Sequence, residues 1–329
     1  MQDESFLEIA ESAARLFVDR PIRIDPIGHS AAATFRVTSG SDALGHLLRV
    51  HVPKVESDDS CWHEPAAIRS ELLWLRALAG AGLPVQAPVP SRSGDWIVEL
   101  DGSRSRTACS CLRWIDGESL EAPIDEDVAD RLGQVCATLH AQAASWAAPL
   151  DFSRPSYDAT RVERSLERFS SLDRAGVIDG ACSASIARAV ERATDPLRQV
   201  LRTEGQSGLI HADLHPGNCL AVGRAIHVID FGRCGFGAWS YDVAEALQYL
   251  GPEERRAFLR GYRRARPDTL LDAEILEPLL LIAIVDAFAT HANDPDERAY
   301  LTSAIPTFVS SYAEPFLHGR PFLFGPESS

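Results

Sequence analysis

Lysine is almost absent from this chain of 329 residues: Lys54 is the single one among 32 lysine and arginine residues. Basic residues are outnumbered by 47 Asp and Glu residues, which gives a formal net charge of −15. A nucleic-acid partner would need a basic face against its phosphates, so the composition argues against one. The acidity could attract a cationic substrate, although a general role in solubility explains it as well.

Long apolar runs and paired cysteines are lacking too. The longest apolar run, Leu279–Val285, continues past Asp286 only to Phe288, which is too short to span a bilayer. The opening Gln2–Arg20 is acidic and amphipathic, whereas a secretory signal is basic and then apolar. The 7 cysteines contain no C-x-x-C pair, which argues against a disulfide framework and a zinc site. We therefore expect a cytoplasmic protein without membrane contact.

The first third of the chain predicts a small mixed sheet with one long helix. Glu4–Val18 repeats apolar residues at the 3.6-residue period of a helix, which Pro21 ends. Pro65 and Gly80 bracket a second helix. Strand patterns occupy residues 22–27, 33–39, 46–52, 88–100 and 108–114.

After Asp116-Gly117 the pattern becomes helical. Amphipathic periodicity predicts helices over residues 125–144, 162–172, 183–201, 241–250, 252–264, 272–292 and 297–316. Short strands are expected only within Leu209–Gly237. The chain therefore divides into an N-terminal helix (1–20), a sheet-rich lobe (21–113) and a larger helical lobe (114–329), with a hinge near Leu112–Asp116.

Two motifs lie close together in the short-strand stretch. His211, Asp213 and Asn218 form the pattern H-x-D-x-x-x-x-N, and Asp230-Phe231-Gly232 follows a predicted strand. Each motif alone is weak, but the pair at this spacing is specific. The alternative, that Asp213 and Asp230 only cap turns, does not explain why the two motifs occur together.

Phosphoryl transfer explains this spacing. The reaction needs an acceptor hydroxyl aimed at the γ-phosphate and metal ions that offset the phosphate charge. A loop that holds Asp213 and Asn218 five residues apart can direct one side chain to the acceptor and the other to a metal. Asp230, at the end of a separate strand, offers the carboxylate oxygens that Mg²⁺ prefers.

These motifs, with the later Tyr241-Asp242-Val243-Ala244, resemble the aminoglycoside phosphotransferase and choline kinase superfamily. The nearest branch is the bacterial one that includes stress-response kinase A and homoserine-kinase-like enzymes. The resemblance extends from Ile22 to about Phe316. It implies an α+β, two-lobed protein-kinase-like fold that binds ATP, or GTP, together with Mg²⁺.

The resemblance also implies roles for individual residues. Asp213 would be the catalytic base, and Asn218 and Asp230 would be magnesium ligands. His211 and Asp242 would brace the catalytic loop.

His215 would brace the same loop or approach the substrate, and the bracing role is favoured.

In the N-terminal lobe the match is looser. Gly28–Ala33, which includes Ser30, would be the phosphate-covering loop, although it contains a single glycine. Arg49 occupies the position of the usual phosphate-binding lysine, and its planar fork is not equivalent to an ammonium group. Glu71 would pair with Arg49, the alternative being a solvated helix face.

The hinge would contribute Leu112 and Trp114, whose backbone would meet the adenine edge of the nucleotide.

Three functions compete at this point: a small-molecule kinase, a serine/threonine protein kinase of the stress-response type, and an inactive nucleotide-binding scaffold. Ala212 stands where regulated protein kinases place an arginine, and the short stretch from Gly232 to Asp242 leaves no room for a long activation segment. Asp213, Asn218 and Asp230 are all intact, which disfavours the scaffold. The sequence favours the small-molecule kinase.

The acceptor is expected to be a small hydroxylated molecule that carries an amine, such as an aminoglycoside-like compound, an amino alcohol or an amino acid. Asp286 lies in a strongly apolar helix, where a carboxylate is costly unless it is paired or faces a cleft. Asp286 is therefore a candidate acceptor-binding residue, and Tyr241 is a second candidate, as an aromatic residue that could wall the cleft. The alternative is an internal ion pair of Asp286 with an arginine, for example Arg260.

Overall fold

The computed structural model describes residues 2–40, 42–53, 62–101, 106–121 and 123–325. Two units are distinguished by their internal contacts. The first contains Met1–Ser119, Trp146–Arg154 and Leu220–Gly232, and the second contains Leu120–Ser145, Pro155–Cys219 and Arg233–Ser329. Asp230 thus belongs to the first unit, whereas Asp213 and Asn218 belong to the second.

The first unit is built on a six-stranded sheet in the order β1-β2-β3-β6-β4, with β5 also paired to β6. All of its described strand pairs are antiparallel. The strands are β1 (Pro21–His29), β2 (Ala33–Ser39), β3 (Asp42–Val50), β4 (Pro88–Val89), β5 (Ile97–Asp101) and β6 (Arg106–Arg113). The unit also contains helix α2 (Pro65–Gly80) and the short strand β7 (Glu118–Ser119), which pairs with β9 (Cys219–Val222).

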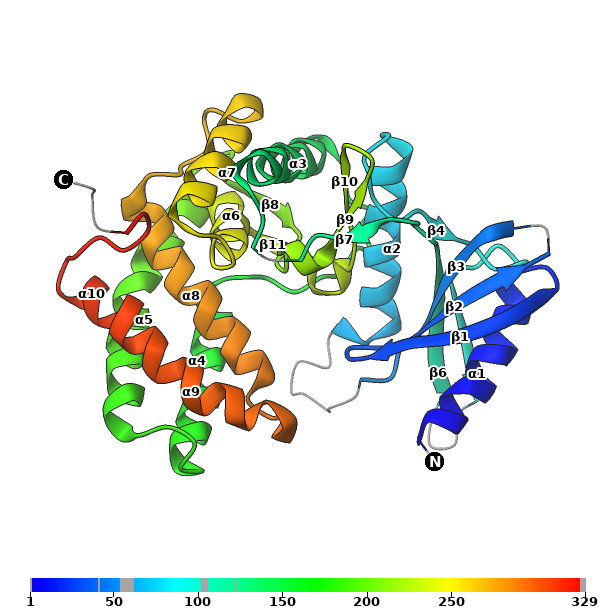
Figure 1. Ribbon diagram of the computed structural model, residues 1–329, viewed down its shortest axis with the longest axis horizontal. Helices are drawn as coiled ribbons and strands as arrows, with labels where there is room; N and C mark the ends of the chain where they lie inside the picture. The colour runs from blue at the N-terminus through cyan, green and yellow to red at the C-terminus, as the bar shows by residue number, and fades with distance from the viewer. Residues whose placement is uncertain (1, 41, 54–61, 102–105, 122, 326–329) are drawn as a thin grey trace. The chain divides into compact units, whose positions relative to one another are not determined.

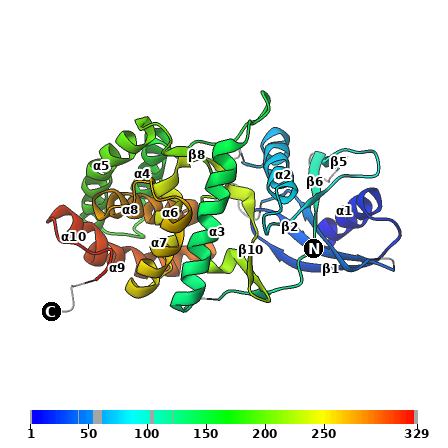
Figure 2. The same cartoon turned by 90° about the horizontal axis from the view of Figure 1, so that it is seen from above.

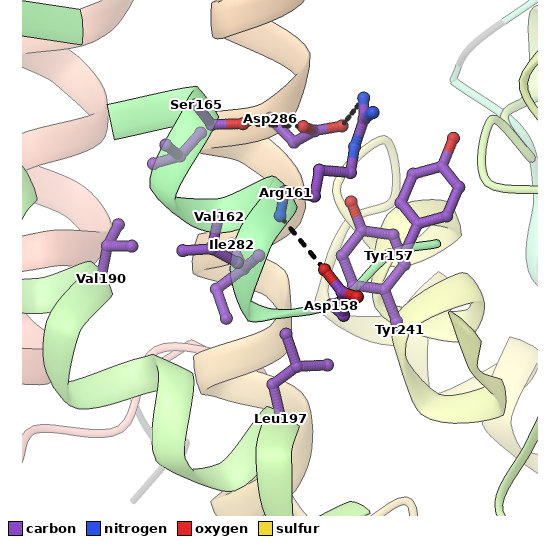
Figure 3. Close-up of a pocket in the computed structure, with 11 residues that line it drawn as sticks. Tyr157, Asp158, Arg161, Val162, Ser165, Val190, Leu197, Tyr241, Ile282 and Asp286 are labelled. Atoms are coloured by element: carbon purple, nitrogen blue, oxygen red, sulfur yellow. Dashed lines mark hydrogen bonds and ion pairs between the residues drawn. The ribbon is translucent and has the colours of Figure 1, made fainter. Parts of the chain in front are cut away.

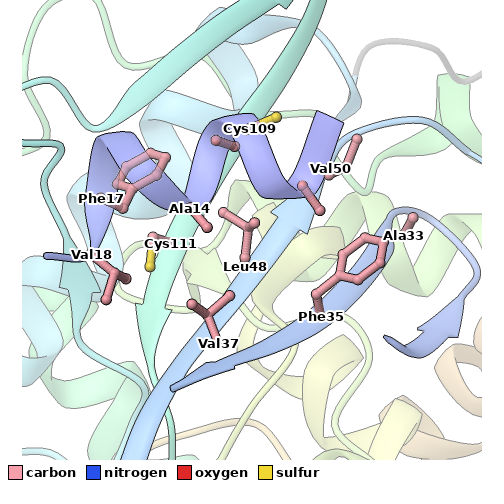
Figure 4. Packing of buried hydrophobic residues seen from close by; sticks show 12 residues of the cluster. Ala14, Phe17, Val18, Ala33, Phe35, Val37, Leu48, Val50, Cys109 and Cys111 are labelled. Atoms are coloured by element: carbon pink, nitrogen blue, oxygen red, sulfur yellow. The ribbon is translucent and has the colours of Figure 1, made fainter. Parts of the chain in front are cut away.

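Helix α1 (Gln2–Phe17) covers one face of this sheet, as Figure 4 shows. Alanines at positions 10, 13 and 14 are fully buried, and their small side chains let the helix lie close to the strands. Along β2, buried Ala33, Phe35 and Val37 alternate with half-buried residues, as expected for a strand with one face in the core. The result is one apolar layer between α1 and the sheet.

The second unit is mostly helical, and Figures 1 and 2 show its helices in two views. They are α3 (Glu126–Ser145), α4 (Ala159–Arg174), α5 (Gly180–Arg202), α6 (Trp239–Leu247), α7 (Pro252–Ala265), α8 (Ala273–His291), α9 (Arg298–Phe308) and α10 (Glu314–Leu317). Strands β8 (Ser207–Ile210) and β11 (Gly235–Ala238) form an antiparallel pair.

Helix α8 lies at the centre of the second unit and contacts α4, α5 and α6. It is buried on nearly all sides from Leu276 to Ala289, so its apolar residues show no preferred face. Asp286 is placed inside this helix, which makes the partners of its charge important for the site described below.

The α+β fold class predicted from the sequence is confirmed, with an antiparallel sheet in the N-terminal part and helices in the C-terminal part. Within the described residues, no helix has both the length and the apolar character needed to cross a membrane.

Two glycines allow α3 and α7 to pack with their backbones in contact. A Cβ at Gly133 would lie 2.0 Å from the Phe258 carbonyl oxygen, and one at Gly261 would lie 1.9 Å from the Asp130 carbonyl oxygen. Both obstacles are backbone atoms, so the helices would have to separate to admit a side chain. The position of α3 matters because it carries His140, which bonds Asp242, the residue that accepts two amides of the candidate catalytic loop.

We predict that Gly261→Ala lowers the free energy of unfolding by about 1–3 kcal/mol, because the added methyl group overpacks the helix crossing. Chemical denaturation measures the change. Gly180→Ala is the matched control, since its Cβ would meet only an Asp173 carboxylate oxygen at 4.0 Å. Equal stability of the two variants would contradict the proposed backbone contact.

Candidate active site

The candidate catalytic loop, residues 211–218, follows β8 and ends in a short 3-10 helix, Pro216–Asn218. Ala212 has a φ of 60°, a left-handed backbone conformation that costs free energy in a residue with a Cβ. Asp242 on α6 supports this conformation. Its Oδ1 accepts the Ala212 N–H at 2.6 Å, and its Oδ2 accepts the His211 N–H at 2.9 Å.

His140 on α3 fixes Asp242 in turn. Its Nε2 lies 2.8 Å from Asp242 Oδ2, and its Nδ1 lies 2.7 Å from the Tyr262 hydroxyl. A carboxylate only accepts hydrogen bonds, so Nε2 donates to Asp242. In the neutral ring Nδ1 then accepts from Tyr262. Cys136 is also near, with Sγ 3.9 Å from Nε2. Cys136, His140 and Asp242 are residue types that can bind a metal and lie together in the interior, and the hydrogen bonds of His140 explain why they do.

The protonation states follow from burial and from this contact. Burial lowers the pKa of His140, and Asp242 offsets the change only in part, so the imidazole is neutral at pH 7. Burial would raise the pKa of Asp242, but the hydrogen bonds from the His140 ring and from the His211 backbone outweigh it and hold that pKa below its usual value. A neutral histidine and a charged carboxylate therefore hold the loop at neutral pH.

Asp213 and Asn218 face each other across the loop. Asn218 Nδ2 donates to the backbone oxygen of Asp213 at 2.9 Å and to its Oδ2 at 3.0 Å. Because the nitrogen of the amide points to Asp213, its Oδ1 is the atom available to a cation. Within the described part of the chain, no hydrogen bond reaches Asp213 Oδ1, and the side chain is 21% exposed. One carboxylate oxygen of Asp213 is thus held by Asn218, and the other makes no hydrogen bond within the described residues.

Arg233 lies beside the free oxygen of Asp213. Its Nη1 is 3.6 Å from Asp213 Oδ1, and its Nη2 is 2.8 Å from Asp286 Oδ2. Asp286 also accepts from Arg161 Nη2 at 2.8 Å and from Ser165 Oγ at 2.9 Å. Burial would raise the pKa of Asp286, but the two arginines hold it below its usual value.

Asp286 therefore forms the internal ion pair that the sequence left open as an alternative, with Arg161 and Arg233. Arg260, the partner considered there, instead pairs with Glu126 at 3.1 Å. Figure 3 shows Asp286 with Arg161 and Ser165 reaching it from α4. Tyr241 is buried and lines the same cavity, which has a volume of about 10 Å³. That volume holds about one water molecule and no acceptor.

His215 lies on the other side of the loop. Its ring is tilted against that of Tyr249, with 4.9 Å between the centroids. Its backbone N–H donates to the Asp213 carbonyl oxygen at 3.1 Å, and its own carbonyl accepts the Asn218 N–H at 2.9 Å. A Cβ at Gly217 would approach the ring to 2.9 Å, so a larger residue there would displace the His215 ring. His215 is thus bonded within the loop through its backbone.

In the first unit, Asp230 follows β10 (Ala225–Val228) with a φ of 58°, and its side chain is exposed. Its Oδ1 accepts the Gly232 N–H at 3.3 Å. Phe231 packs edge-to-face on Trp74 of α2, with 5.4 Å between the ring centroids. The Gly232 carbonyl accepts from Arg154 Nη2 at 2.6 Å. The buried neighbours anchor the motif and leave the carboxylate accessible to a cation.

Arg49 and Glu71 form a buried ion pair in the same unit, with 2.7 Å between Nη1 and Oε1. Arg49 Nε donates to Ser110 Oγ at 3.2 Å, and this hydroxyl also bonds His51 at 2.8 Å. Burial and the Arg49 charge lower the pKa of His51 well below its usual value. Among the described residues, Arg49 Nη2 is buried without a hydrogen-bond partner. Such an atom is costly unless a ligand oxygen satisfies it.

The predicted phosphate-covering loop forms the turn between β1 and β2. Gly28 is the penultimate residue of β1, and its carbonyl oxygen accepts from Thr34 Oγ1 at 3.0 Å. Ser30 is exposed, and its N–H donates to the Ala32 carbonyl at 3.2 Å. Both residues therefore belong to one tight hairpin.

The predicted adenine-binding hinge lies at the end of β6. Leu112 is buried and pairs with Leu47 and Pro88. The Trp114 N–H donates to the Gly45 carbonyl at 3.2 Å, and the Trp114 ring stacks under the Arg36 guanidinium at 4.4 Å. The Trp114 amide is thus bonded within the sheet, and a nucleotide would need other backbone atoms of the hinge.

Sequence reasoning missed His140, Arg233 and Glu245. His140 sits on an apolar helix face, where a histidine has no distinctive pattern. Arg233 directly follows the D-F-G motif, and that position was a usable signal. Glu245 is one helical turn after Asp242 and fully buried. Burial, which Arg233 offsets in part, raises the pKa of Glu245 well above its usual value.

The antiparallel sheet, the helical C-terminal part and the loop with Asp213 and Asn218 define a protein-kinase-like phosphotransferase fold. Residues 23–273 match the phosphotransferase enzyme family, and the chain belongs to this family. This match confirms the family resemblance that the catalytic motifs indicated. A choline kinase from Cryptosporidium parvum shares the fold, with a TM-score of 0.64 and 15% identity.

Two curated relatives illustrate the range of the family. An uncharacterized protein of Deinococcus radiodurans is 32% identical, over 74% of this chain and 68% of its own length. A homoserine kinase of Neisseria meningitidis is 30% identical, over 58% of this chain and 60% of its own. The chain spans about two thirds or less of the length of such relatives, 65% in the case of a Synechocystis protein.

Two solved structures share nearly the whole fold. A microcompartment-associated aminopropanol kinase has a TM-score of 0.79 and 26% identity, covering 95% of this chain and 98% of its own. An amicoumacin kinase solved with AMP-PNP, Ca²⁺ and its substrate has a TM-score of 0.73 and 18% identity, covering 97% and 95%. Proteins of this fold are thus crystallised with nucleotide and a divalent cation.

We predict that His140→Leu lowers the free energy of unfolding by about 1–3 kcal/mol, because Asp242 and Tyr262 lose a buried partner. The pH dependence changes as well. The pKa of His140 is lower in the folded chain than in the unfolded one. The unfolded chain therefore binds more protons below about pH 6.5, and stability falls as the pH decreases.

Urea denaturation between pH 7.5 and 5.5 measures both effects. The wild type should lose stability toward pH 5.5, and His140→Leu should lose less. The slope that remains comes from His51, His63 and His227, whose pKa values are also lowered, and is reduced by Glu245, whose raised pKa acts in the opposite direction. An identical slope in both proteins would refute the neutral His140.

Proposed function

We propose that the protein is an ATP-dependent phosphotransferase that moves the γ-phosphate to a hydroxyl group of a small molecule. The observation that carries the proposal is the state of Asp213. Asn218 holds Oδ2, while Oδ1 makes no hydrogen bond among the described residues and the side chain is 21% exposed. A carboxylate oxygen in this state can accept the proton of an acceptor hydroxyl.

Asn218 and Asp230 would hold Mg²⁺, which offsets the phosphate charge during transfer. Both residues fit this role chemically, since the Asn218 amide offers Oδ1 and the Asp230 carboxylate is exposed at the end of its strand. Oxygen ligands of this kind suit Mg²⁺. Asp213 would orient the hydroxyl and take its proton.

Arg49 would bind the nucleotide phosphates. Its Nη1 is fixed by Glu71 and its Nε by Ser110, which leaves Nη2 for a phosphate oxygen. Gly28 and Ser30 would cover the phosphates from the β1–β2 turn, and the chain after Leu112 would meet the adenine. ATP is the expected nucleotide, with GTP as the alternative.

The acceptor would be a small molecule that bears both a hydroxyl and an amine, such as an aminoglycoside-like compound, an amino alcohol or an amino acid. The named relatives support this class, since they include a homoserine kinase and an aminopropanol kinase. They also favour a small molecule over the protein substrate of a stress-response kinase. Asp286 is not proposed as the amine partner, because both of its oxygens are used by Arg161, Arg233 and Ser165.

A nucleotide-consumption screen tests the proposal. Purified protein with Mg·ATP is offered homoserine, 1-amino-2-propanol, choline, spectinomycin and a generic protein substrate in separate reactions. We expect ADP release to depend on one of the amine-bearing small molecules. Phosphorylation of the protein substrate alone would favour the protein kinase, and no dependence on any acceptor would favour the scaffold.

We predict that Asp213→Asn lowers turnover by roughly 10²-fold or more and leaves nucleotide binding nearly intact, because only the base is lost. Asp230→Ala should instead weaken the binding of Mg·ATP itself. Turnover assays and titration with a fluorescent ATP analogue separate the two effects. An Asp213→Asn variant that retains most of its activity would show that the base is another group.

We predict that Arg49→Ala raises the KM for ATP by about tenfold or more, because a charge-assisted hydrogen bond is lost. Arg49→Lys should be milder, since it keeps a cation. Arg23→Ala is the control, as its ion pair with Asp25 is exposed. Equal KM values for Arg49→Ala and Arg23→Ala would argue against a phosphate contact.

A further inference from the structure

Four alternating charges form a row through the second unit. Arg161 and Arg233 each lie 2.8 Å from Asp286 Oδ2, and Arg233 then lies 3.6 Å from Asp213 Oδ1. The charges of the row sum to zero, so each buried charge has a neighbour of opposite sign. The side chains of Asp286 and Arg161 are only 4% and 5% exposed, so water contributes little to this end of the row.

The two contacts of Arg233 are unequal. At 2.8 Å its bond to Asp286 is a charge-assisted hydrogen bond. At 3.6 Å its approach to Asp213 is an electrostatic contact without a hydrogen bond. A shift of the guanidinium by less than 1 Å would close that gap and occupy the one accessible oxygen of the base.

We propose that Asp286 is a positioning residue that holds Arg233 away from the catalytic base Asp213. The two carboxylates compete for one guanidinium. Arg233 bonds the buried carboxylate of Asp286, because Arg161 and Ser165 already hold that carboxylate in place. Asp213 Oδ1 consequently remains available to the acceptor hydroxyl, while the positive charge of Arg233 stays next to the site. This inference rests on the proposed function for the role of Asp213.

Neighbouring contacts hold Arg161 and Arg233, the two arginine partners of Asp286, in place. Asp158 caps α4 by accepting the N–H groups of Thr160 and Arg161 at 3.0 and 3.2 Å, which fixes the turn that carries Arg161. The Arg161 guanidinium lies over the Tyr157 ring at 4.6 Å. The Tyr157 hydroxyl donates to the Arg233 carbonyl oxygen at 2.7 Å. Arg233 is therefore held through both its side chain and its backbone.

An acceptor contact for Asp286 does not fit these observations. Ser165 occupies Oδ1 and the two arginines occupy Oδ2. The adjoining cavity of about 10 Å³ admits one water molecule at most. The carboxylate acts on the site through Arg233.

The test uses Asp286→Asn combined with Arg161→Gln. The double variant removes the negative charge of Asp286 together with the positive charge of Arg161, so Arg161 is not left buried without an ion-pair partner. A crystal structure of this double variant is the first readout. We expect Arg233 to move toward Asp213 until Nη and Oδ1 are about 3 Å apart, a hydrogen-bond distance. Arg233 unchanged at its present distance, or turned away from Asp213, would overturn the proposal.

Kinetics with Mg·ATP and 1-amino-2-propanol or homoserine give the second readout. The double variant should lose about tenfold or more in kcat, with an acceptor KM within about threefold of the wild type. Adding Arg233→Gln to the double variant should restore part of kcat, because it frees Asp213 again. An increased KM at unchanged kcat would overturn the proposal and make Asp286 an acceptor contact.

Arg260→Gln serves as the matched control, since it removes an exposed arginine–carboxylate pair of the same unit. Thermal melting of all variants shows whether the fold is retained. If the double variant does not fold, the crystal structure of Arg233→Lys decides instead. A lysine reaches one carboxylate only, and its Nζ should bind Asp286; binding to Asp213 would overturn the proposal.

If the wild type phosphorylates no acceptor of the screen, that result counts against the proposed function, whereas the crystal structures still decide the position of Arg233.

Discussion

The buried carboxylate of Asp242 is the contact on which the geometry of the candidate active site depends. The loop before Asp213 includes Ala212 in a left-handed backbone conformation, which a residue with a Cβ adopts only where its surroundings compensate. Asp242 supplies two short hydrogen bonds to the loop amides, and His140 with Tyr262 fixes the carboxylate from behind. Loop, α3, α6 and α7 are thus joined by one chain of hydrogen bonds, and the α3–α7 packing at Gly133 and Gly261 becomes part of the site.

Arg49 occupies the position where related kinases usually have a lysine. A lysine offers one nitrogen, whereas the guanidinium offers three, and here each can serve a different purpose. Nη1 binds Glu71, Nε binds Ser110, and Nη2 is left buried and unsatisfied within the described residues. Compared with a lysine, the arginine gives up a compact point charge, but it keeps its ion pair with Glu71 and would still have a donor for the proposed phosphate contact.

Much of the fold was predictable, because the spacing of apolar residues along a helix or strand indicates which of its faces is buried. The 3.6-residue pattern of α1 and the alternation in β2 define the faces that meet in the core. The catalytic motifs were predictable because their chemistry fixes residue type and spacing together. The partners of Asp286 were not, because an ion pair between α4, α8 and the D-F-G segment depends on tertiary packing. Arg161 and Arg260 look alike in the sequence, and only the fold shows which one reaches the carboxylate.

The central claim is that the protein transfers the γ-phosphate of ATP to a hydroxyl group of a small molecule. ³¹P NMR of the wild-type protein with Mg·ATP and a pool of hydroxylated amines measures this transfer without a coupling enzyme. The account predicts that the γ-phosphate resonance declines while a new phosphomonoester resonance appears, together with ADP. ADP accompanied only by inorganic phosphate, or no change in the ATP resonances over the whole pool, would contradict it.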